Sequence, residues 1–322
     1  MDTRQAARGI HLTELGLGTS QLGNLGRATS DEDSASAVEA AWRSGIRYFD
    51  TAPHYGLGLS ERRLGPLLRN YPRDEFVIST KVGRILEPNQ GSFPDGETPW
   101  DTEGFAVRAN YVRRFDLSRD GIRKSLNDSL SRLGMDRVDI AYLHDPDGRE
   151  DEAVRTALPA LAELRDEGLV RAVGAGMNSA APLARFAREA DVDILMVAGR
   201  LTLLDCSALD DLVDTASSCK VSLVAAGVFS SGLLATARPR PDAMFEYEPA
   251  SRVIRERANL LADIAAGHGV DLPAVAIHYP LLWQEFASVV VGARSGAQVS
   301  DLIRHYETDV CMDVYDDMGL PR

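Results

Sequence analysis

Four residues that can exchange protons or carry charge stand at the ends of short apolar runs. Asp50 ends the run 46–50 and Tyr55 lies in the turn after it, while Lys81 ends the run 76–81 and His144 ends the run 138–144. A phenol with an ordinary pKa of about 10 is a poor acid or base at neutral pH. A nearby ammonium lowers that pKa, and a carboxylate keeps the ammonium charged and in place. The set therefore predicts proton transfer at an oxygen, with Tyr55 as the acid or base and His144 orienting the substrate.

Each of these residues also has an ordinary structural explanation when it is taken alone. A strand-end aspartate is often a turn former or a helix cap, a strand-end lysine is usually solvated, and a lone histidine can be a satisfied core residue. Parallel strands that close into a barrel bring their carboxyl ends to one mouth. Successive strand ends that all carry such groups favour a shared site over three coincidences.

The elements that must position these residues alternate along the chain. Because alternation of strands and helices is typical of a parallel sheet with crossover helices, about eight units in 322 residues predict a (β/α)8 barrel, an α/β fold, as a single domain over 1–322. A doubly wound sheet with a second domain is the alternative, but no linker or composition shift marks a boundary. The expected strands are 11–18, 46–50, 76–81, 138–144, 169–174, 194–197, 221–225 and 288–291, and the expected helices are 31–44, 60–68, 118–133, 151–167, 181–189, 208–217, 251–267, 273–284 and 297–307.

Residues 84–116 interrupt this alternation, as a long loop after the third strand. They contain prolines and glycines, and we detect no helical or strand period in them. Loops of this length in compact domains are usually functional or disordered, and the aromatic content argues against disorder. We expect a lid over a pocket, with aromatic side chains at Phe93, Trp100, Phe105, Tyr111 and Phe115.

Composition excludes several classes of function. The formal net charge of −13 argues against nucleic acid as a partner. Three cysteines suit no secreted disulfide framework, and neither a leader-like segment nor a membrane-spanning apolar run is found, which together predict a cytoplasmic protein with no membrane partner. Six histidines without metal-ligand spacing predict no metal site.

Phosphate-binding motifs are incomplete. Two Gly-x-Gly segments, at Gly56 and Gly174, lack the third glycine of a dinucleotide fingerprint. The loops after strands seven and eight of a barrel offer another anion site, and here they read 227–234 and 292–298, the second leading into a helix N-terminus. Both are alternatively ordinary polar turns. A hydride carrier bound there would supply the redox partner that the four residues lack.

Several ordered motifs resemble the aldo-keto reductase superfamily, with similarity from about residue 13 to residue 307. The resemblance rests on Gly16-Leu-Gly-Thr19, Phe49-Asp-Thr-Ala-Pro-His-Tyr-Gly56, Ser79-Thr-Lys81, Arg132-Leu-Gly-Met-Asp-Arg-Val-Asp139 and Tyr142-Leu-His144. It implies a barrel that binds a nicotinamide cofactor at its mouth, with Asp50, Tyr55, Lys81 and His144 as the catalytic tetrad. Segments 143–147, 198–205 and 115–121 are similar to aldose 1-dehydrogenases that act on L-fucose, D-threo-aldoses or L-galactose, and to pyridoxal 4-dehydrogenase.

The same resemblance implies a set of cofactor contacts and some departures from the usual pattern. The cationic positions that hold a 2′-phosphate align with Gly292 and Gln298, so NAD is expected in preference to NADP, although Arg294 could supply one cation. The implied cofactor-binding residues are Gly18, Thr19, Asp50, Asn178, Ser230, Ser231, Gly232, Gly292, Arg294, Ser295 and Gln298.

The first hypothesis is an NAD(P)-dependent dehydrogenase that oxidises C1 of an aldose to a lactone. A pyridoxal 4-dehydrogenase and a general aldehyde or ketone reductase are alternatives, because the tetrad serves either direction. From another class, the chain could be a cofactor-bound sensor subunit like the potassium-channel β subunits, which would require a partner-binding face. The expected partner is a small sugar or aldehyde.

Overall fold

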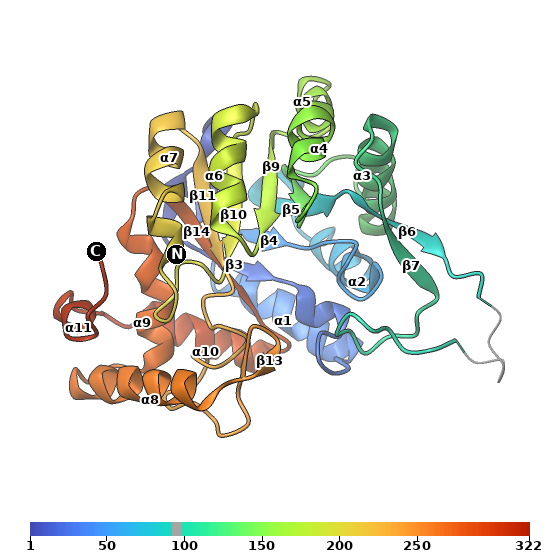
Figure 1. The fold of residues 1–322 in the computed structure, drawn as a ribbon. Helices are drawn as coiled ribbons and strands as arrows, with labels where there is room; N and C mark the ends of the chain where they lie inside the picture. The colour runs from blue at the N-terminus through green and yellow to red at the C-terminus, as the bar shows by residue number, and fades with distance from the viewer. Residues whose placement is uncertain (92–97) are drawn as a thin grey trace.

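The computed structural model describes residues 1–91 and 98–322, and its centre is a closed barrel of eight parallel strands (Figure 1). Each strand pairs with the next in chain order, and the last pairs with the first. The expected fold class is therefore confirmed. The barrel strands are β3 (Leu15–Gly18), β4 (Tyr48–Asp50), β5 (Val77–Val82), β8 (Ile140–His144), β9 (Ala172–Met177), β10 (Ile194–Ala198), β11 (Ser222–Ala226) and β14 (Phe286–Gly292).

Helices surround the barrel and bury most of the apolar residues between themselves and the strands (Figure 1). Serine N-caps start several of them: Ser30 accepts a hydrogen bond from Asp33 N, and Ser118 accepts one from Gly121 N. The helices are α1 (Asp31–Arg43), α2 (Leu59–Leu68), α3 (Arg119–Leu133), α4 (Glu150–Glu152), α5 (Leu158–Asp166), α6 (Ala180–Glu189), α7 (Leu212–Cys219), α8 (Arg252–Gly267), α9 (Leu272–His278), α10 (Gly296–Tyr306) and α11 (Asp313–Asp317).

A short antiparallel hairpin, β1 (Thr3–Gln5) and β2 (His11–Thr13), closes the N-terminal end of the barrel. Its buried residues Ile10 and Leu12 pack with barrel-interior residues such as Tyr48 and Ile140. The expected single strand over 11–18 is thus two strands, of which only β3 belongs to the barrel. The closed end leaves the carboxyl ends of the strands as the mouth for chemistry.

Segment 84–116 contains strands, so the expectation of a loop without regular structure is wrong. Strands β6 (Arg84–Pro88) and β7 (Tyr111–Phe115) pair antiparallel over five residues each and project from the barrel beside α3 (Figure 1). The period-2 pattern of a strand is hidden here for two reasons. Both strands carry charged side chains, and each pairs with a strand more than 20 residues away. Phe93, named above as a lid aromatic, lies outside the described residues.

Several element boundaries also differ from expectation. Strand β9 continues to Met177 rather than ending at 174; its two glycines have low strand propensity, which hid this extension in the sequence. Gly174 allows close packing on β10, since a Cβ there would lie 1.7 Å from Ile194 O. Helix α9 ends at His278, two residues before Pro280, and a 3₁₀ turn follows. One π-helical turn (Ala153–Ala157) separates α4 from α5.

Two further short strands, β12 (Met244–Phe245) and β13 (Glu248–Pro249), form a hairpin in the segment between β11 and α8.

Across the described residues, no single helix is both long and apolar enough to cross a membrane. Helix α8 taken with 272–282 meets the length and composition criteria, but this pair is bent by 95°.

Candidate active site

Lys81 is the centre of a buried polar network at the mouth of the barrel. Its ammonium lies 2.6 Å from Asp50 Oδ2, 3.0 Å from Tyr55 OH and 3.1 Å from the Thr51 carbonyl oxygen. The side chains of Lys81 and Asp50 are each 3% exposed. The structure therefore brings Asp50 and Tyr55 together through Lys81, which contacts both, as expected from strand ends and a following turn at one mouth.

Strand alternation explains why these side chains face one another. Asp50, Lys81 and His144 end or nearly end the neighbouring strands β4, β5 and β8, and successive strand residues point alternately to the barrel interior and to the helices. Two positions below Lys81, Ser79 donates a hydrogen bond of 2.7 Å to Asp50 Oδ1. Asp50 is thus held from two sides, and its second oxygen is directed at Lys81.

The loop that carries Tyr55 is fixed by a separate set of hydroxyl contacts. Thr19 Oγ1 donates to the Asp50 carbonyl oxygen at 2.8 Å, and Ser60 Oγ lies 2.7 Å from Thr19 Oγ1 and 3.0 Å from Thr51 Oγ1. Ser60 lies in the first turn of α2, whose N-cap position is occupied by Gly58. The buried Thr19 and Ser60 anchor the start of the loop that carries Tyr55.

The far side of the same loop docks closely onto the turn after β3. A Cβ on Gly56, whose φ is +62°, would lie 2.2 Å from the Gly23 carbonyl oxygen. Only glycine fits such an approach in a left-handed conformation. The position of Tyr55 is consequently set by backbone packing on one side and by Lys81 on the other.

The expectation that Lys81 would lower the pKa of Tyr55 is wrong for the net shift. Burial raises the pKa of Tyr55 to about 12, and the opposing effect of the Lys81 charge is smaller. Burial also acts to lower the pKa of Lys81, but Asp50 and Tyr55 outweigh it, so that this pKa is raised. At neutral pH the pair is therefore an ammonium hydrogen-bonded to a neutral phenol.

His144 lies beside Tyr55 and is neutral. The two ring centroids are 6.0 Å apart and nearly perpendicular. Burial, with smaller effects of Arg84 and Lys81, holds the pKa of His144 well below its ordinary value. A neutral imidazole offers one donor and one acceptor, which suits hydrogen bonding to a substrate oxygen.

Sequence reasoning missed an ionic cluster that the β6–β7 hairpin places over the loop that carries Tyr55. Arg113 on β7 contacts both carboxylate oxygens of Asp101, at 2.6 and 3.1 Å, and donates to the His54 carbonyl oxygen at 3.0 Å. Both partners of this ion pair are nearly buried, at 6% and 5% exposure. Arg113 therefore fastens the segment after residue 98 to the residue adjacent to Tyr55.

Arg84 on β6 extends this cluster to the next strand end. Its guanidinium lies 3.1 Å from Oδ2 of Asp145, the residue that follows His144 in the chain. It also lies 3.8 Å from Glu103 Oε2. Burial raises the pKa of Asp145, against the opposing charge of Arg84. In the hairpin Arg84 is paired with Phe115 and Leu86 with Arg113, so both arginines lie on one of its faces. Because this pairing joins segments more than 20 residues apart, no local pattern in the sequence signalled it.

Phe105 is the aromatic residue of this segment that covers the site. It is buried, and its ring centroid lies 6.1 Å from that of Tyr55 and 5.2 Å from that of His54. Trp100, by contrast, is 58% exposed. Among the described residues of this segment, Phe105 is therefore the aromatic side chain that packs against Tyr55, as the expected lid would.

The residues predicted to hold a cofactor lie along one arc of the mouth. Strands β10, β11, β14 and β3 are consecutive in the barrel, and they end in Ala198, Ala226, Gly292 and Gly18 respectively. These four residues are small, whereas β4, β5 and β8 carry Asp50, Lys81 and His144 at or near their ends. A nicotinamide cofactor would supply the hydride exchange that the proton-transfer groups lack, and the residues predicted to hold it follow β9, β11, β14 and β3 next to Asp50.

The loop after β14 has its own internal contacts. The Arg294 guanidinium donates to the carbonyl oxygens of Leu25 and Arg27 and to Thr29 Oγ1, so it holds the 25–29 segment. Ser295 caps α10 by accepting from Gln298 N, and Gln298 Oε1 accepts from Arg294 N. Their roles as cofactor contacts, like those of Thr19 and Asp50, stay predictions.

The turn after β11 is strained, as a specialised loop would be. Ser230, Ser231 and Gly232 all have positive φ angles, and Ser231 Oγ accepts a hydrogen bond from Tyr247 N in the β12–β13 hairpin. This hairpin lies next to the mouth, because Glu246 forms an ion pair with Arg200 after β10. Any role of this turn in holding a cofactor also stays a prediction.

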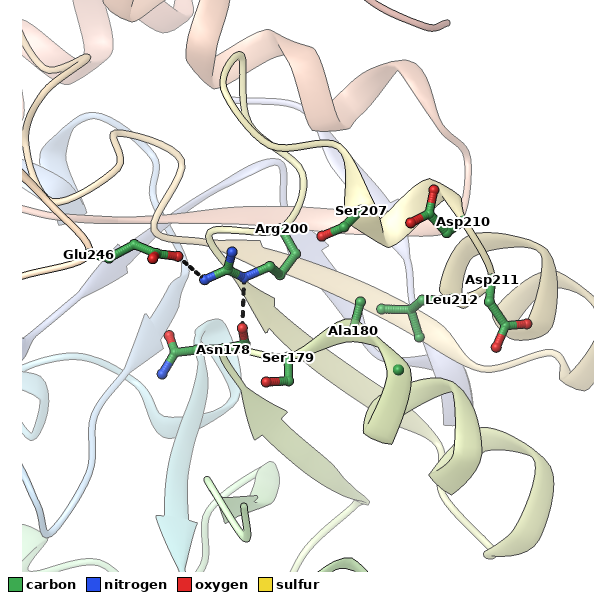
Figure 2. Close-up of a pocket in the computed structure, with 10 residues that line it drawn as sticks. Asn178, Ser179, Ala180, Arg200, Ser207, Asp210, Asp211, Leu212 and Glu246 are labelled. Carbon is green, nitrogen blue, oxygen red and sulfur yellow. Dashed lines mark hydrogen bonds and ion pairs between the residues drawn. The ribbon is translucent and has the colours of Figure 1, made fainter. Parts of the chain in front are cut away.

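Asn178 follows β9 and lines a cavity of about 540 Å³ between the first turn of α6 and the segment before α7 (Figure 2). Arg200 crosses this cavity, donating to the Asn178 carbonyl oxygen at 2.7 Å and pairing with Glu246 (Figure 2). None of the four tetrad residues lines it. We therefore locate the candidate active site by its converging titratable groups and not by this cavity.

Over the described ranges, no group of three or more His, Cys, Asp or Glu side chains is arranged to hold a metal ion.

Comparison with known proteins gives a consistent family. The model of the aldo/keto reductase family matches residues 14–318. A D-threo-aldose 1-dehydrogenase from Pseudomonas sp is 46% identical over 92% of this chain and 89% of its own length. A pyridoxal 4-dehydrogenase from Microbacterium luteolum is 38% identical, covering 94% and 92%, and an L-galactose dehydrogenase from Arabidopsis thaliana is 30% identical, covering 91% and 84%.

Solved structures support the fold. A glycerol dehydrogenase from Gluconobacter oxydans superposes with a TM-score of 0.79 at 23% identity, covering 99% of this chain and 94% of its own. An aldo-keto reductase from Bacillus halodurans gives a TM-score of 0.75 at 24% identity, covering 99% and 95%.

Proposed function

Because this chain belongs to the aldo/keto reductase family and is an NAD(P)-dependent oxidoreductase, we propose that it is an aldose 1-dehydrogenase, which oxidises C1 of a sugar to a lactone. The observation that carries the proposal is the 46% identity to a D-threo-aldose 1-dehydrogenase over 92% of the chain. The contacts among Asp50, Lys81 and Tyr55 support the proton-transfer half of this reaction.

In the proposed reaction, Tyr55 accepts the proton of the anomeric hydroxyl during oxidation and would donate it during reduction. Its hydroxyl is held by Lys81 Nζ at 3.0 Å, and Asp50 in turn keeps Lys81 charged and placed. The neutral His144 hydrogen-bonds the same substrate oxygen and orients it. A bound nicotinamide would supply the hydride exchange at C1 that these side chains cannot perform. With its pKa raised to about 12, Tyr55 is ready as an acid for reduction, and as a base for oxidation it becomes more effective as the pH rises.

The charges around the site support a neutral substrate. Arg84 and Arg113 are each paired with carboxylates, so neither guanidinium is left as an open anion site. An anionic substrate would have to displace one of these partly buried pairs, at a cost in desolvation and lost contacts. A sugar, which has many hydroxyls and no charge, meets no such penalty.

The proposal includes NAD in preference to NADP. Gly292 and Gln298 provide no cation for a 2′-phosphate, and Arg294, the remaining candidate, is engaged by three oxygens of residues 25–29. It also includes a cytoplasmic location, which is supported by the free cysteines Cys206, Cys219 and Cys311.

A second candidate is oxidation of pyridoxal, which is supported by the 38% identical pyridoxal 4-dehydrogenase. Reduction of simple aldehydes by the same tetrad is the third. The three differ in substrate and direction, and they share the Tyr55 chemistry.

The test is a substrate panel followed at the nicotinamide absorbance. L-Fucose, L-galactose, D-arabinose and pyridoxal are offered with NAD and NADP, and simple aldehydes with the reduced cofactors. We expect the highest kcat/KM with an aldose and NAD, and lactone as the product. Turnover of pyridoxal or simple aldehydes alone, with no aldose oxidised, would refute the proposed function.

A further inference from the structure

His54 lies within the catalytic loop, next to Tyr55, and the chemistry described so far does not use its side chain. The imidazole packs edge-to-face with its neighbours: its centroid lies 5.4 Å from that of His144 and 6.2 Å from that of Tyr55. With the 6.0 Å between Tyr55 and His144, the three rings form a nearly equilateral triangle. Phe105 covers the outer side of His54 at 5.2 Å.

Among the residues that the structure describes, two ring nitrogens in this triangle are buried without a hydrogen-bond partner, Nδ1 of His54 and Nδ1 of His144. A buried polar atom without a partner costs about 1–3 kcal/mol, and native structures keep few of them. Nε2 of His54 is not one of these buried atoms and has no hydrogen bond among the described residues, so it is the nitrogen of this ring that a ligand can reach.

The carboxylate of Glu103 lies beside the His54 ring. Its Oε2 lies 3.6 Å from His54 Nδ1, slightly beyond hydrogen-bond distance, and the carboxylate is held near Arg113 and Arg84 at 3.4 and 3.8 Å. Burial, together with the charges of Arg113, Arg84 and Lys81, lowers the pKa of His54 to about 3, so the ring is neutral. A carboxylate only accepts hydrogen bonds, so it favours the tautomer with its proton on Nδ1 and leaves Nε2 as an acceptor.

We propose that His54 is a specificity-determining residue that hydrogen-bonds the hydroxyl on the carbon adjacent to the reacting carbon, with Glu103 as the positioning residue that fixes its tautomer. The reacting oxygen is held between Tyr55 and His144. The oxygen on the next carbon is then directed at the third ring of the triangle. This inference rests on the proposed function in naming a sugar as substrate, but it applies equally to any 2-hydroxy carbonyl compound.

The experiment compares two substrates that differ in this one hydroxyl. Lactaldehyde and propanal are reduced by the full-length enzyme with the reduced cofactor that the wild type prefers, and kcat/KM is measured for each. The variants are His54→Phe, which keeps an aromatic ring without hydrogen bonds, His54→Asn, which keeps a donor and an acceptor, and Glu103→Gln. His11→Phe is the matched control, since His11 is exposed on β2 at the closed end of the barrel.

We expect His54→Phe to lower kcat/KM for lactaldehyde by about 10- to 100-fold while the value for propanal changes by less than about threefold. His54→Asn should recover part of the discrimination, Glu103→Gln should lose a smaller part of it, and His11→Phe should match the wild type. Equal losses on both substrates, or no loss on either, would overturn the proposal. Should the wild type reduce neither aldehyde, the same ratio is measured in oxidation with D-arabinose and its 2-deoxy counterpart.

The two proposals fail in different ways. If no aldose is oxidised but His54→Phe still separates lactaldehyde from propanal, the proposed function is wrong and the role of His54 stands. If aldoses are oxidised and His54→Phe does not change the ratio, the reverse holds. Unchanged quenching of protein fluorescence by the cofactor shows that each variant is folded.

Discussion

Replacement of Lys81 by Met should both abolish activity and destabilise the protein. The loss of stability should come from the buried Asp50 carboxylate that is left without its cation, and a second substitution at Asp50 can test this. In the wild type, Lys81 Nζ lies 2.6 Å from Asp50 Oδ2, and each side chain is only 3% exposed. Lys81→Met leaves the Asp50 carboxylate in place with the Ser79 hydroxyl as its remaining side-chain partner. An uncompensated buried charge of this kind costs about 3–5 kcal/mol.

The double variant Lys81→Met/Asp50→Asn removes the stranded charge as well. Its neutral amide still reaches Ser79, and the remaining cost is that of imperfectly paired polar groups, about 1–2 kcal/mol. The double variant should therefore be about 2–3 kcal/mol more stable than Lys81→Met alone. Both variants should lack activity, because Tyr55 loses the ammonium that lies 3.0 Å from its hydroxyl.

The assay is urea unfolding at pH 7, followed by the fluorescence of the three tryptophans, with midpoints compared at a common m-value. Lys124→Met is the matched control, because Lys124 pairs with Asp128 at an exposed site and should change stability by less than about 1 kcal/mol. If Lys81→Met destabilises no more than Lys124→Met, or if the double variant is no more stable than Lys81→Met, the buried ion pair does not have the role assigned to it.

Further predictions concern the proton, the acid side of stability and the cofactor. Tyr55→Phe should lower kcat in both directions by at least about 1,000-fold while the Kd of the cofactor stays within twofold; retained turnover would contradict its role. With the pKa of Tyr55 at about 12, kcat/KM for oxidation should rise about tenfold per pH unit between pH 7 and 9, and a plateau below pH 8 would count against phenolate as the base. An unfolded histidine takes up its proton near pH 6.5 but folded His54 only near pH 3, so stability should fall by about 1.4 kcal/mol per unit as the pH drops through this window. His54→Asn should flatten that slope in urea unfolding at pH 4–7, and an unchanged slope would exclude His54 as its source. Arg294→Met should lower affinity for NAD and NADP equally, because its guanidinium holds residues 25–29; a selective loss of NADP binding would show that Arg294 contacts the 2′-phosphate.

The barrel and the convergence of the tetrad could be predicted because both follow from periodicity. Runs of buried apolar residues end in Asp50, Lys81 and His144, and parallel strands place those ends at one mouth. Tyr55 needs one further step, since its position depends on the turn after β4 and on the close packing of Gly56 against Gly23. These are local features of the chain or direct consequences of its topology.

The electrostatics could not be predicted in the same way. The tetrad composition suggested a lowered pKa for Tyr55, because Lys81 is the nearest charge. The structure shows that burial outweighs that charge. Desolvation depends on everything that surrounds the hydroxyl, including Phe105 from a segment some 50 residues away, and no spacing rule conveys it.

The contacts of the β6–β7 hairpin are the clearest case of information that only the tertiary structure supplies. They also help to explain why the reaction is easier to infer than the substrate. Relatives that are 46%, 38% and 30% identical carry the names of a threo-aldose, a pyridoxal and a galactose dehydrogenase. The proton transfer proposed for Asp50, Tyr55 and Lys81 would be the same for any of these substrates, so their contacts cannot distinguish the substrates. Another polar side chain close to Tyr55 is that of His54. Two residues from the segment after residue 98 position it: Arg113 donates to the His54 carbonyl oxygen, and Glu103 faces the His54 ring. Specificity should therefore follow changes in this segment. Exchanging it between relatives should then transfer substrate preference while leaving the Tyr55 pH dependence unchanged.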